Sequence, residues 1–132
     1  MDTVFTKIIS GELASYKIAE TPYFYSFLDI RPNAKGHTLV IPKQPIDYFF
    51  DIDEKTYVDL LLFSKKIASA LKKSIPCKKI AMSVIGLEVP HAHVHLIPIN
   101  NMADTNFTKE KLELSDNEFK LLADKIRSNL EI

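Results

Sequence analysis

The chain has 132 residues, long enough to bury a core without metals or disulfides, and its length predicts a single domain over residues 1–132. Basic and acidic residues number 17 each, so zero net charge gives no reason to expect a nucleic-acid or membrane partner. The one cysteine, Cys77, excludes an intrachain disulfide and fits a reducing compartment. No apolar run approaches the roughly 20 residues that cross a bilayer, and no signal peptide is recognisable. We therefore expect a soluble, cytoplasmic protein.

The first part of the chain predicts a short helix followed by a pair of strands. Residues 1–10 have the composition of a short helix that ends near Gly11. The aromatic and apolar run at 23–30 is typical of a strand. Turn-forming residues at 32–36 precede another apolar run at 37–42, which we expect to pair antiparallel with the first strand.

The second part predicts a long helix, another strand pair and a last helix. Residues 51–74 carry apolar side chains at helical spacing, with acidic residues near the start and lysines at the end, as the helix dipole favours. Residues 79–86 and 91–98 are typical of two strands joined by a short loop. Ser115 and Glu118 form a capping-box pattern that predicts the start of a C-terminal helix. Strands grouped apart from long helices favour an α+β domain with an antiparallel sheet.

Three of the four histidines lie two residues apart in the stretch HAHVH. If this stretch is a strand, His91, His93 and His95 line one face, while Ala92 and Val94 line the other and can pack on a core. Three adjacent cations would repel one another, so at least one imidazole should stay neutral. A neutral imidazole keeps a nitrogen lone pair, which can bind a metal, move a proton or attack an electrophile.

Three interpretations of this stretch follow from the residues. The histidines could be accidental polar residues of a half-buried strand. They could hold a metal such as zinc, although the outer two Cα atoms of such a strand would lie roughly 13 Å apart. One of them could be a nucleophile, with neighbours that set its tautomer and bind a charged substrate, which also requires an anion pocket. Composition alone does not exclude the metal site.

The stretch HAHVHLI at 91–97 matches the His-x-His-x-His signature of the histidine triad (HIT) family. The blocks at 5–13, 27–43 and 86–98 also resemble HIT blocks in the family's order, so the similarity covers roughly residues 4–98. The resemblance implies a HIT-like α+β fold, with an antiparallel sheet of about five strands, a long middle helix and a C-terminal helix. It also implies a homodimer, with the middle helix and a sheet edge at the interface.

HIT proteins bind nucleotides, and many cleave the α-phosphate bond of nucleoside phosphoramidates, adenylates or dinucleoside polyphosphates. The resemblance implies that His93 attacks the phosphorus of a purine nucleotide of the AMP type and forms a nucleotidyl-imidazole, with release of NMP after hydrolysis. His91 and His95 would support it through orientation and phosphate contact. Imidazole is a good nucleophile and, once protonated, a good leaving group, so one hard displacement becomes two easier ones. The alternatives are a nucleotide-binding regulatory or scaffold protein with little turnover, and a metal-dependent enzyme.

The resemblance also implies a nucleotide pocket. Asp29 matches the family's ribose-binding acid, because a carboxylate can accept hydrogen bonds from both sugar hydroxyls. The other implied nucleotide-binding positions are Phe5, Ile8, Phe27, Ile30, Leu39, Ser83, Glu88 and Val89. We expect the Glu88 carboxylate to point away from the phosphate, which would repel it, and to lend only its backbone N–H. We interpret His37 as a structural histidine.

The chain departs from the family at the zinc-site positions and around the phosphate loop, where Ser83 replaces a frequent asparagine and Glu88 a frequent serine or threonine. Many HIT proteins carry a Cys-x-x-Cys near the N-terminus and a histidine after the IPK block, as parts of a zinc site. Thr3, Thr6 and Pro45 stand at or near these positions, so we predict no structural zinc, no metal ligands and no required cofactor. The phosphate loop is shorter and has Leu87 where the family often has a glutamine. These changes bear on substrate range and rate more than on the fold.

Overall fold

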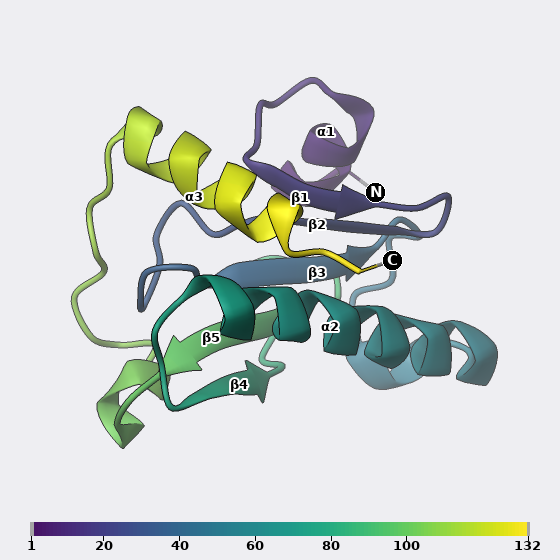
Figure 1. Cartoon of the computed structure of the whole chain (residues 1–132). Helices are drawn as coiled ribbons and strands as arrows, with labels where there is room; N and C mark the ends of the chain where they lie inside the picture. The colour runs from purple at the N-terminus through teal and green to yellow at the C-terminus, as the bar shows by residue number, and fades with distance from the viewer. Residues whose placement is uncertain (1, 132) are drawn as a thin grey trace.

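The computed structural model of the chain describes residues 2–131, in which five strands form one antiparallel sheet and three α-helices pack around it (Figure 1). The order of the strands in the sheet is β1-β2-β3-β5-β4. The strands are β1 Lys17–Glu20, β2 Phe24–Leu28, β3 Thr38–Pro42, β4 Lys79–Ser83 and β5 Val94–Ile99. The helices are α1 Val4–Ser10, α2 Glu54–Ser74 and α3 Asp116–Ser128. The expected α+β fold, with a five-stranded antiparallel sheet, a long middle helix and a C-terminal helix, is confirmed.

The helices begin and end at residues that satisfy their free backbone groups. Ser115 makes the expected capping box at the start of α3. Gly11 adopts a left-handed conformation and ends α1, as expected. The helix expected over 51–74 begins instead at Glu54, because the side chain of Asp53 caps its first turn. None of the helices in the described residues is both long enough and apolar enough to cross a membrane.

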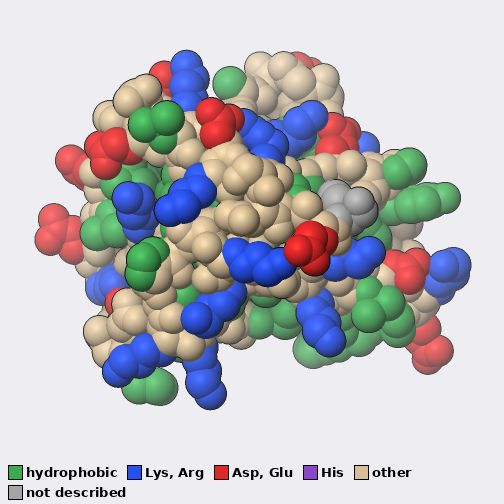
Figure 2. Space-filling model, in the orientation of Figure 1, with side chains coloured by type: hydrophobic (Ala, Val, Ile, Leu, Met, Phe, Trp, Pro, Cys, Tyr) green, Lys and Arg blue, Asp and Glu red, His purple; other side chains and the backbone are tan. Residues whose placement is uncertain are grey.

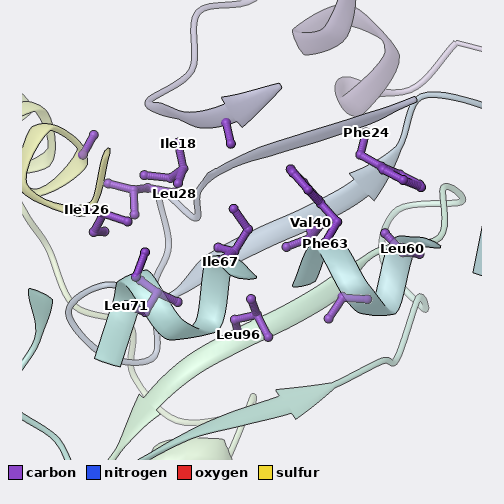
Figure 3. Packing of buried hydrophobic residues seen from close by; sticks show 14 of the residues in the cluster. Ile18, Phe24, Leu28, Val40, Leu60, Phe63, Ile67, Leu71, Leu96 and Ile126 are labelled. Carbon is purple, nitrogen blue, oxygen red and sulfur yellow. The ribbon is translucent and has the colours of Figure 1, made fainter. Parts of the chain in front are cut away.

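The larger core lies between one face of the sheet and helices α2 and α3. Figure 3 shows side chains from these elements pointing toward one another, and they are almost fully buried. The labelled residues of this cluster are Ile18, Phe24, Leu28, Val40, Leu60, Phe63, Ile67, Leu71, Leu96 and Ile126. Each buried aliphatic or aromatic side chain stabilises the fold by roughly 1.5–3 kcal/mol, so this cluster fixes the positions of the strands. On the face drawn in Figure 2, charged side chains of both signs are scattered and no histidine is visible.

A smaller cluster covers the opposite face of the sheet, where α1 packs. Its buried residues are Phe5, Tyr25, Phe27, Leu39 and Ile41, with Ile8, Ile9 and Val89 packed against them. Side chains alternate between the two faces along a strand, so β2 contributes to both clusters and is buried along its whole length. This second face also carries the histidines.

The strand expected over 91–98 begins only at Val94, so His91 and His93 precede it. The backbone of this stretch leaves the sheet, because the N–H of Ala92 donates to the carbonyl of Ile46, in the connection that leads to α2, at 2.7 Å. The expectation that all three histidines lie on one strand is therefore wrong. The intervening Ala92 and Val94 still pack into the larger core, as expected.

The two edge strands also differ from expectation. β1, at Lys17–Glu20, was not predicted from the sequence, and it pairs with β2 through a bulge. β4 ends at Ser83 rather than residue 86, and Ser83 forms its last pair with β5. The chain then turns away from the sheet, and Gly86 adopts a left-handed conformation with φ of 72°.

Candidate active site

The three histidines of the triad gather on the face of the sheet that α1 covers. His91, His93 and His95 are 0%, 6% and 8% exposed. The ring of Phe5 lies with its centroid 5.0 Å from that of His93 and 5.8 Å from that of His91. The centroids of His93 and His95 are 4.9 Å apart. The residues expected to carry the chemistry are thus brought together in a largely desolvated place.

The tautomer of His93 follows from its backbone partner. Its Nδ1 lies 2.7 Å from the carbonyl oxygen of His91. A carbonyl only accepts hydrogen bonds, so Nδ1 carries the hydrogen and the neutral ring keeps its lone pair on Nε2. Burial lowers the pKa of His93, because it disfavours the charged ring. The result is a neutral imidazole whose nucleophilic nitrogen is Nε2.

The tautomer of His95 is set by a chain of two hydrogen bonds. The backbone N–H of Asn33 donates to Nδ1 of His37 at 3.0 Å, so the hydrogen of the His37 ring must lie on Nε2. That Nε2 lies 2.9 Å from Nδ1 of His95, which therefore accepts. The hydrogen of the neutral His95 ring is consequently on Nε2, where it can be donated to a ligand. His37 thus has the structural role expected of it, and it acts by orienting His95.

Both members of this pair are neutral at ordinary pH. Burial lowers the pKa of His37 to about 3, and the nearby charges of Lys111 and His93 act in the same direction. Burial likewise lowers the pKa of His95 to about 3, with contributions from His93, His37 and Lys111. The hydrogen bonds agree with this, because Nδ1 of His37 accepts from Asn33 and Nδ1 of His95 accepts from His37, so each ring keeps one unprotonated nitrogen.

His91 is directed toward the sheet. Its Nε2 donates to the carbonyl oxygen of Pro42, at the end of β3, at 2.7 Å. Its Nδ1 is buried and has no hydrogen-bond partner in residues 2–131. Burial lowers the pKa of His91, so this nitrogen stays unprotonated. His91 therefore supports His93 through its own backbone carbonyl.

Asp29 lies beside the His37–His95 pair. One carboxylate oxygen, Oδ2, is 3.6 Å from Nε2 of His37, and the other accepts a hydrogen bond from the N–H of Arg31 at 2.9 Å. Burial raises the pKa of Asp29, and the hydrogen bond from Arg31 opposes this. Asp29 can therefore accept further hydrogen bonds when it is ionised.

Asp29, His37 and His95 each offer one possible ligand atom, and these three atoms lie within 4.8 Å of one another, a spacing that a metal ion could use. The hydrogen bonds argue against this role. The N–H of Asn33 occupies Nδ1 of His37, so Nε2 of that ring carries a hydrogen and offers no lone pair to a metal. The arrangement suits proton donation and acceptance better than metal ligation.

The other expected nucleotide-binding residues fall into two groups. Phe5, Phe27 and Leu39 are buried in the smaller cluster, with Ile8 and Val89 packed against it, whereas Ile30 is 66% exposed and lies just beyond the end of β2. Ser83 pairs with His95 across β4 and β5, so their side chains share a face of the sheet. Glu88 is exposed, and its charge opposes the effect of burial on the pKa of His93.

Two residues near the site were not predicted from the sequence. The ring of Phe107 lies with its centroid 4.6 Å from that of His95 and 6.0 Å from that of His37. Lys111 donates hydrogen bonds to the carbonyl oxygen of Phe107 and to Oδ1 of Asn33. Both follow the last strand in an irregular segment, outside the blocks that resemble the HIT family. The one sequence feature that could have indicated this segment is Phe107, an aromatic residue in an otherwise polar loop.

Chemically, the site places a neutral nucleophile, Nε2 of His93, next to an oriented donor, Nε2 of His95. The carboxylate of Asp29 and buried apolar side chains, among them Phe5, lie beside them. A nucleophile needs stabilisation of the charge that develops on the atom it attacks, and a fixed donor in a desolvated site supplies this. The arrangement suits attack on an electrophile that carries anionic oxygen atoms, such as a phosphate ester or phosphoramidate.

Comparison with known proteins agrees with this geometry. The HIT domain model matches residues 10–102. A HIT-like protein of Borreliella burgdorferi is 37% identical over 137 residues, covering 98% of this chain and 99% of that protein. An adenosine 5′-monophosphoramidase of Schizosaccharomyces pombe is 30% identical over 133 residues, covering 99% and 100% of the two chains. A solved HIT-like protein of Bartonella henselae aligns with a TM-score of 0.83 and 30% identity, over 98% and 97% of the chains. The chain therefore belongs to the HIT domain family.

Proposed function

We propose that this protein is a nucleotide hydrolase or transferase that cleaves the α-phosphate bond of nucleoside phosphoramidates, acyl-adenylates or dinucleoside polyphosphates and releases NMP. The observation that carries the proposal is the hydrogen bond from Nδ1 of His93 to the carbonyl of His91, because it leaves a lone pair on Nε2. The oriented donor on His95 and the similarity to an adenosine 5′-monophosphoramidase support it.

In the first step, Nε2 of His93 attacks the α-phosphorus and forms an N–P bond. The bond to the leaving group breaks, and the leaving group departs with the electron pair and takes up a proton from water. The imidazole becomes cationic, and its Nδ1–H remains bonded to the carbonyl of His91. The Nε2–H of His95 donates to a non-bridging phosphate oxygen and stabilises the negative charge there.

In the second step, water attacks the same phosphorus and the N–P bond breaks. NMP leaves with the oxygen of the attacking water, and the electrons of the N–P bond return to Nε2 and restore the neutral imidazole. The proton that this water loses neutralises the hydroxide left when water protonated the leaving group. Asp29 would accept hydrogen bonds from the ribose hydroxyls through the oxygen that Arg31 does not occupy. The base would lie against Phe5, Phe27 and Leu39, and a largely apolar pocket of this kind discriminates weakly between purines.

We propose that this chemistry needs no structural zinc and no cofactor. The side chains of Thr3 and Thr6 offer only hydroxyl groups where zinc-binding relatives have cysteines, and zinc in proteins is held by thiolate, imidazole or carboxylate ligands. Both hydroxyls are engaged in the cap of α1. Chelators are therefore expected to leave the rate unchanged.

We also propose a homodimer that uses α2 and the free edge of β4. Val58 and Leu62 are exposed on α2, and Met82 on β4 and Val84 just after it are exposed as well. A sheet edge presents unpaired backbone groups, which pairing with a second copy would satisfy. Sedimentation velocity should give twice the mass of the chain, and a monomer at micromolar concentration would contradict this arrangement.

The test is a turnover assay with adenosine 5′-phosphoramidate and an adenylated lysine analogue, on wild type and His93→Ala, with and without chelator. We expect AMP release by the wild type only, independent of chelator. Acid-quenched wild type should also carry a nucleotide on His93, and the variant should carry none. Retained thermal stability and AMP affinity in His93→Ala would show that the fold is intact.

The other outcomes identify the alternatives. AMP binding by wild type without release of AMP from either substrate would favour a nucleotide-binding regulatory or scaffold protein. Release that the chelator abolishes would favour a metal-dependent enzyme. Equal rates for wild type and His93→Ala would exclude His93 as the nucleophile.

A further inference from the structure

The ammonium group of Lys111 is held in one place beside the active site. Its Nζ donates to the carbonyl oxygen of Phe107 at 2.9 Å and to Oδ1 of Asn33, and it lies 5.3 Å from the centroid of the Phe107 ring. That ring packs against His95. These contacts define the position of the ammonium group relative to the histidines, at the cost of side-chain rotamer freedom.

The loop that holds Lys111 is itself tied to the loop that holds Asp29. The side chain of Asn33 is buried, and its Nδ2 donates to the carbonyls of Asp104 and Asn106 at 3.2 and 3.3 Å. Its Oδ1 accepts from Lys111. The amide of Asn33 therefore joins two segments that are more than 70 residues apart in the chain. The ammonium group of Lys111 is therefore held against the site and is not free to move through solvent.

The charge of Lys111 acts on one side of the site. Burial raises the pKa of Asp29, and the Lys111 charge pulls it back down; the same charge adds to the effect of burial on His95. Glu88 instead acts on Asp29 and on His93. Arg31 is the other charged group that acts on Asp29. Within the triad, the positive charge of Lys111 therefore acts on His95, whereas the negative charge of Glu88 acts on His93.

We propose that Lys111 is a specificity-determining residue, whose fixed positive charge favours substrates with negative charge beyond the α-phosphate. Such substrates are dinucleoside polyphosphates, as opposed to phosphoramidates with an uncharged leaving group. The inference rests on the proposed function for its substrate classes. The HIT domain model ends at residue 102, so this residue lies outside the part of the chain that defines the family.

The test compares kcat/KM for diadenosine tetraphosphate with kcat/KM for adenosine 5′-phosphoramidate. Lys111→Met should lower the ratio of the two by roughly three- to tenfold, the size expected for one charge in a partly solvated site. Lys111→Arg keeps the charge and should keep most of the ratio. Lys109→Met is the matched control, because Lys109 belongs to the same segment and pairs instead with Asp104 at 3.6 Å.

The dependence of this ratio on salt distinguishes an electrostatic role of Lys111 from a purely structural one. Raising the ionic strength from about 0.05 to 0.5 M should lower the ratio in wild type and Lys109→Met, because screening weakens the field of Lys111. In Lys111→Met the ratio should respond less to salt. An unchanged ratio in Lys111→Met would overturn the proposal. An equal loss for both substrates, together with a lower Tm, would show that Lys111 only ties the two loops together.

The same experiments distinguish failure of the hydrolase proposal from failure of the Lys111 proposal. If wild type releases no AMP from either substrate, the hydrolase proposal fails, and the charge effect is then measured by binding. Lys111→Met should still weaken the affinity for ATP more than the affinity for AMP. Equal weakening of both affinities would overturn the role of Lys111 in that case as well.

Discussion

Replacing His37 by Phe tests whether His95 is held as a hydrogen-bond donor. Phenylalanine keeps a buried ring of similar size but removes both nitrogens. The N–H of Asn33 then loses its acceptor, and Nδ1 of His95 loses its donor. His37→Gln is the matched control, because its amide can accept from Asn33 and donate to His95 at the same time.

The expected magnitude follows from burial. Asn33 and His37 are each 1% exposed, so water cannot easily replace the lost partners. A buried donor left without an acceptor costs roughly 1–3 kcal/mol, and the free energy of unfolding should fall by about that amount. Loss of one oriented donor to a developing oxyanion lowers kcat by roughly 10²- to 10³-fold. We expect about 10- to 100-fold here, because a freed His95 still adopts the productive tautomer part of the time.

The direct assay is long-range ¹H–¹⁵N correlation of the imidazole rings, which identifies the protonated nitrogen of each. Near neutral pH, the wild type should show hydrogen on Nδ1 of His93 and on Nε2 of His37, His91 and His95. In His37→Phe, the signals of His95 should indicate exchange between tautomers. Wild-type His95 protonated on Nδ1 would refute the reasoning, and so would a Phe variant with the wild-type rate.

Three further outcomes are expected. A Cβ at Gly36, where φ is +94°, would lie 3.0 Å from the nearest neighbouring side chain, whereas nothing lies within 4 Å of one at Gly11. In urea denaturation, Gly36→Ala should therefore lower the free energy of unfolding by about 2–4 kcal/mol and Gly11→Ala by about 1 kcal/mol, and equal losses would contradict this. Asp29→Asn removes a charge that burial destabilises, so Tm at pH 7 should hold or rise, while calorimetry should show AMP binding weakened by about tenfold. The pKa values of about 3 for His37 and His95 lie below 6.5, the value of an unperturbed histidine, so the unfolded chain takes up protons first. The free energy of unfolding should therefore be unaffected by these two histidines above pH 6.5 and should fall as the pH drops from 6.5 toward 3. The fall should be less steep in His37→Phe, which has one of the two groups fewer.

Elements with a local signal could be predicted from the sequence, and elements without one could not. The serine that caps α3 and the left-handed Gly11 mark helix ends through groups only a few residues away. β1 has only four residues, of which two are buried and adjacent, and a bulge breaks its alternation. Its place in the sheet is set by pairing with β2, which the pattern of four residues does not specify.

The site shows the same division. The spacing of His91, His93 and His95 predicts that they form one site, and their burial and proximity confirm that they lie together. Their protonation states depend on groups far away in the chain, such as the carbonyl of Pro42 and the N–H of Asn33. Such contacts leave no periodic pattern. The segment after β5 that packs on His95 was missed for the same reason.

The way in which the rings are oriented has a consequence for how the protein can evolve. The groups that set the tautomers of His93 and of the His37–His95 pair are a peptide carbonyl and a peptide N–H, which every residue carries whatever its side chain. Substitutions around the site can therefore change the fit of a ligand without moving the hydrogen on Nδ1 of His93. At position 33 only proline would remove the N–H. The tautomer of His93 is thus insensitive to most single mutations nearby, whereas the residues that would contact a ligand are free to vary.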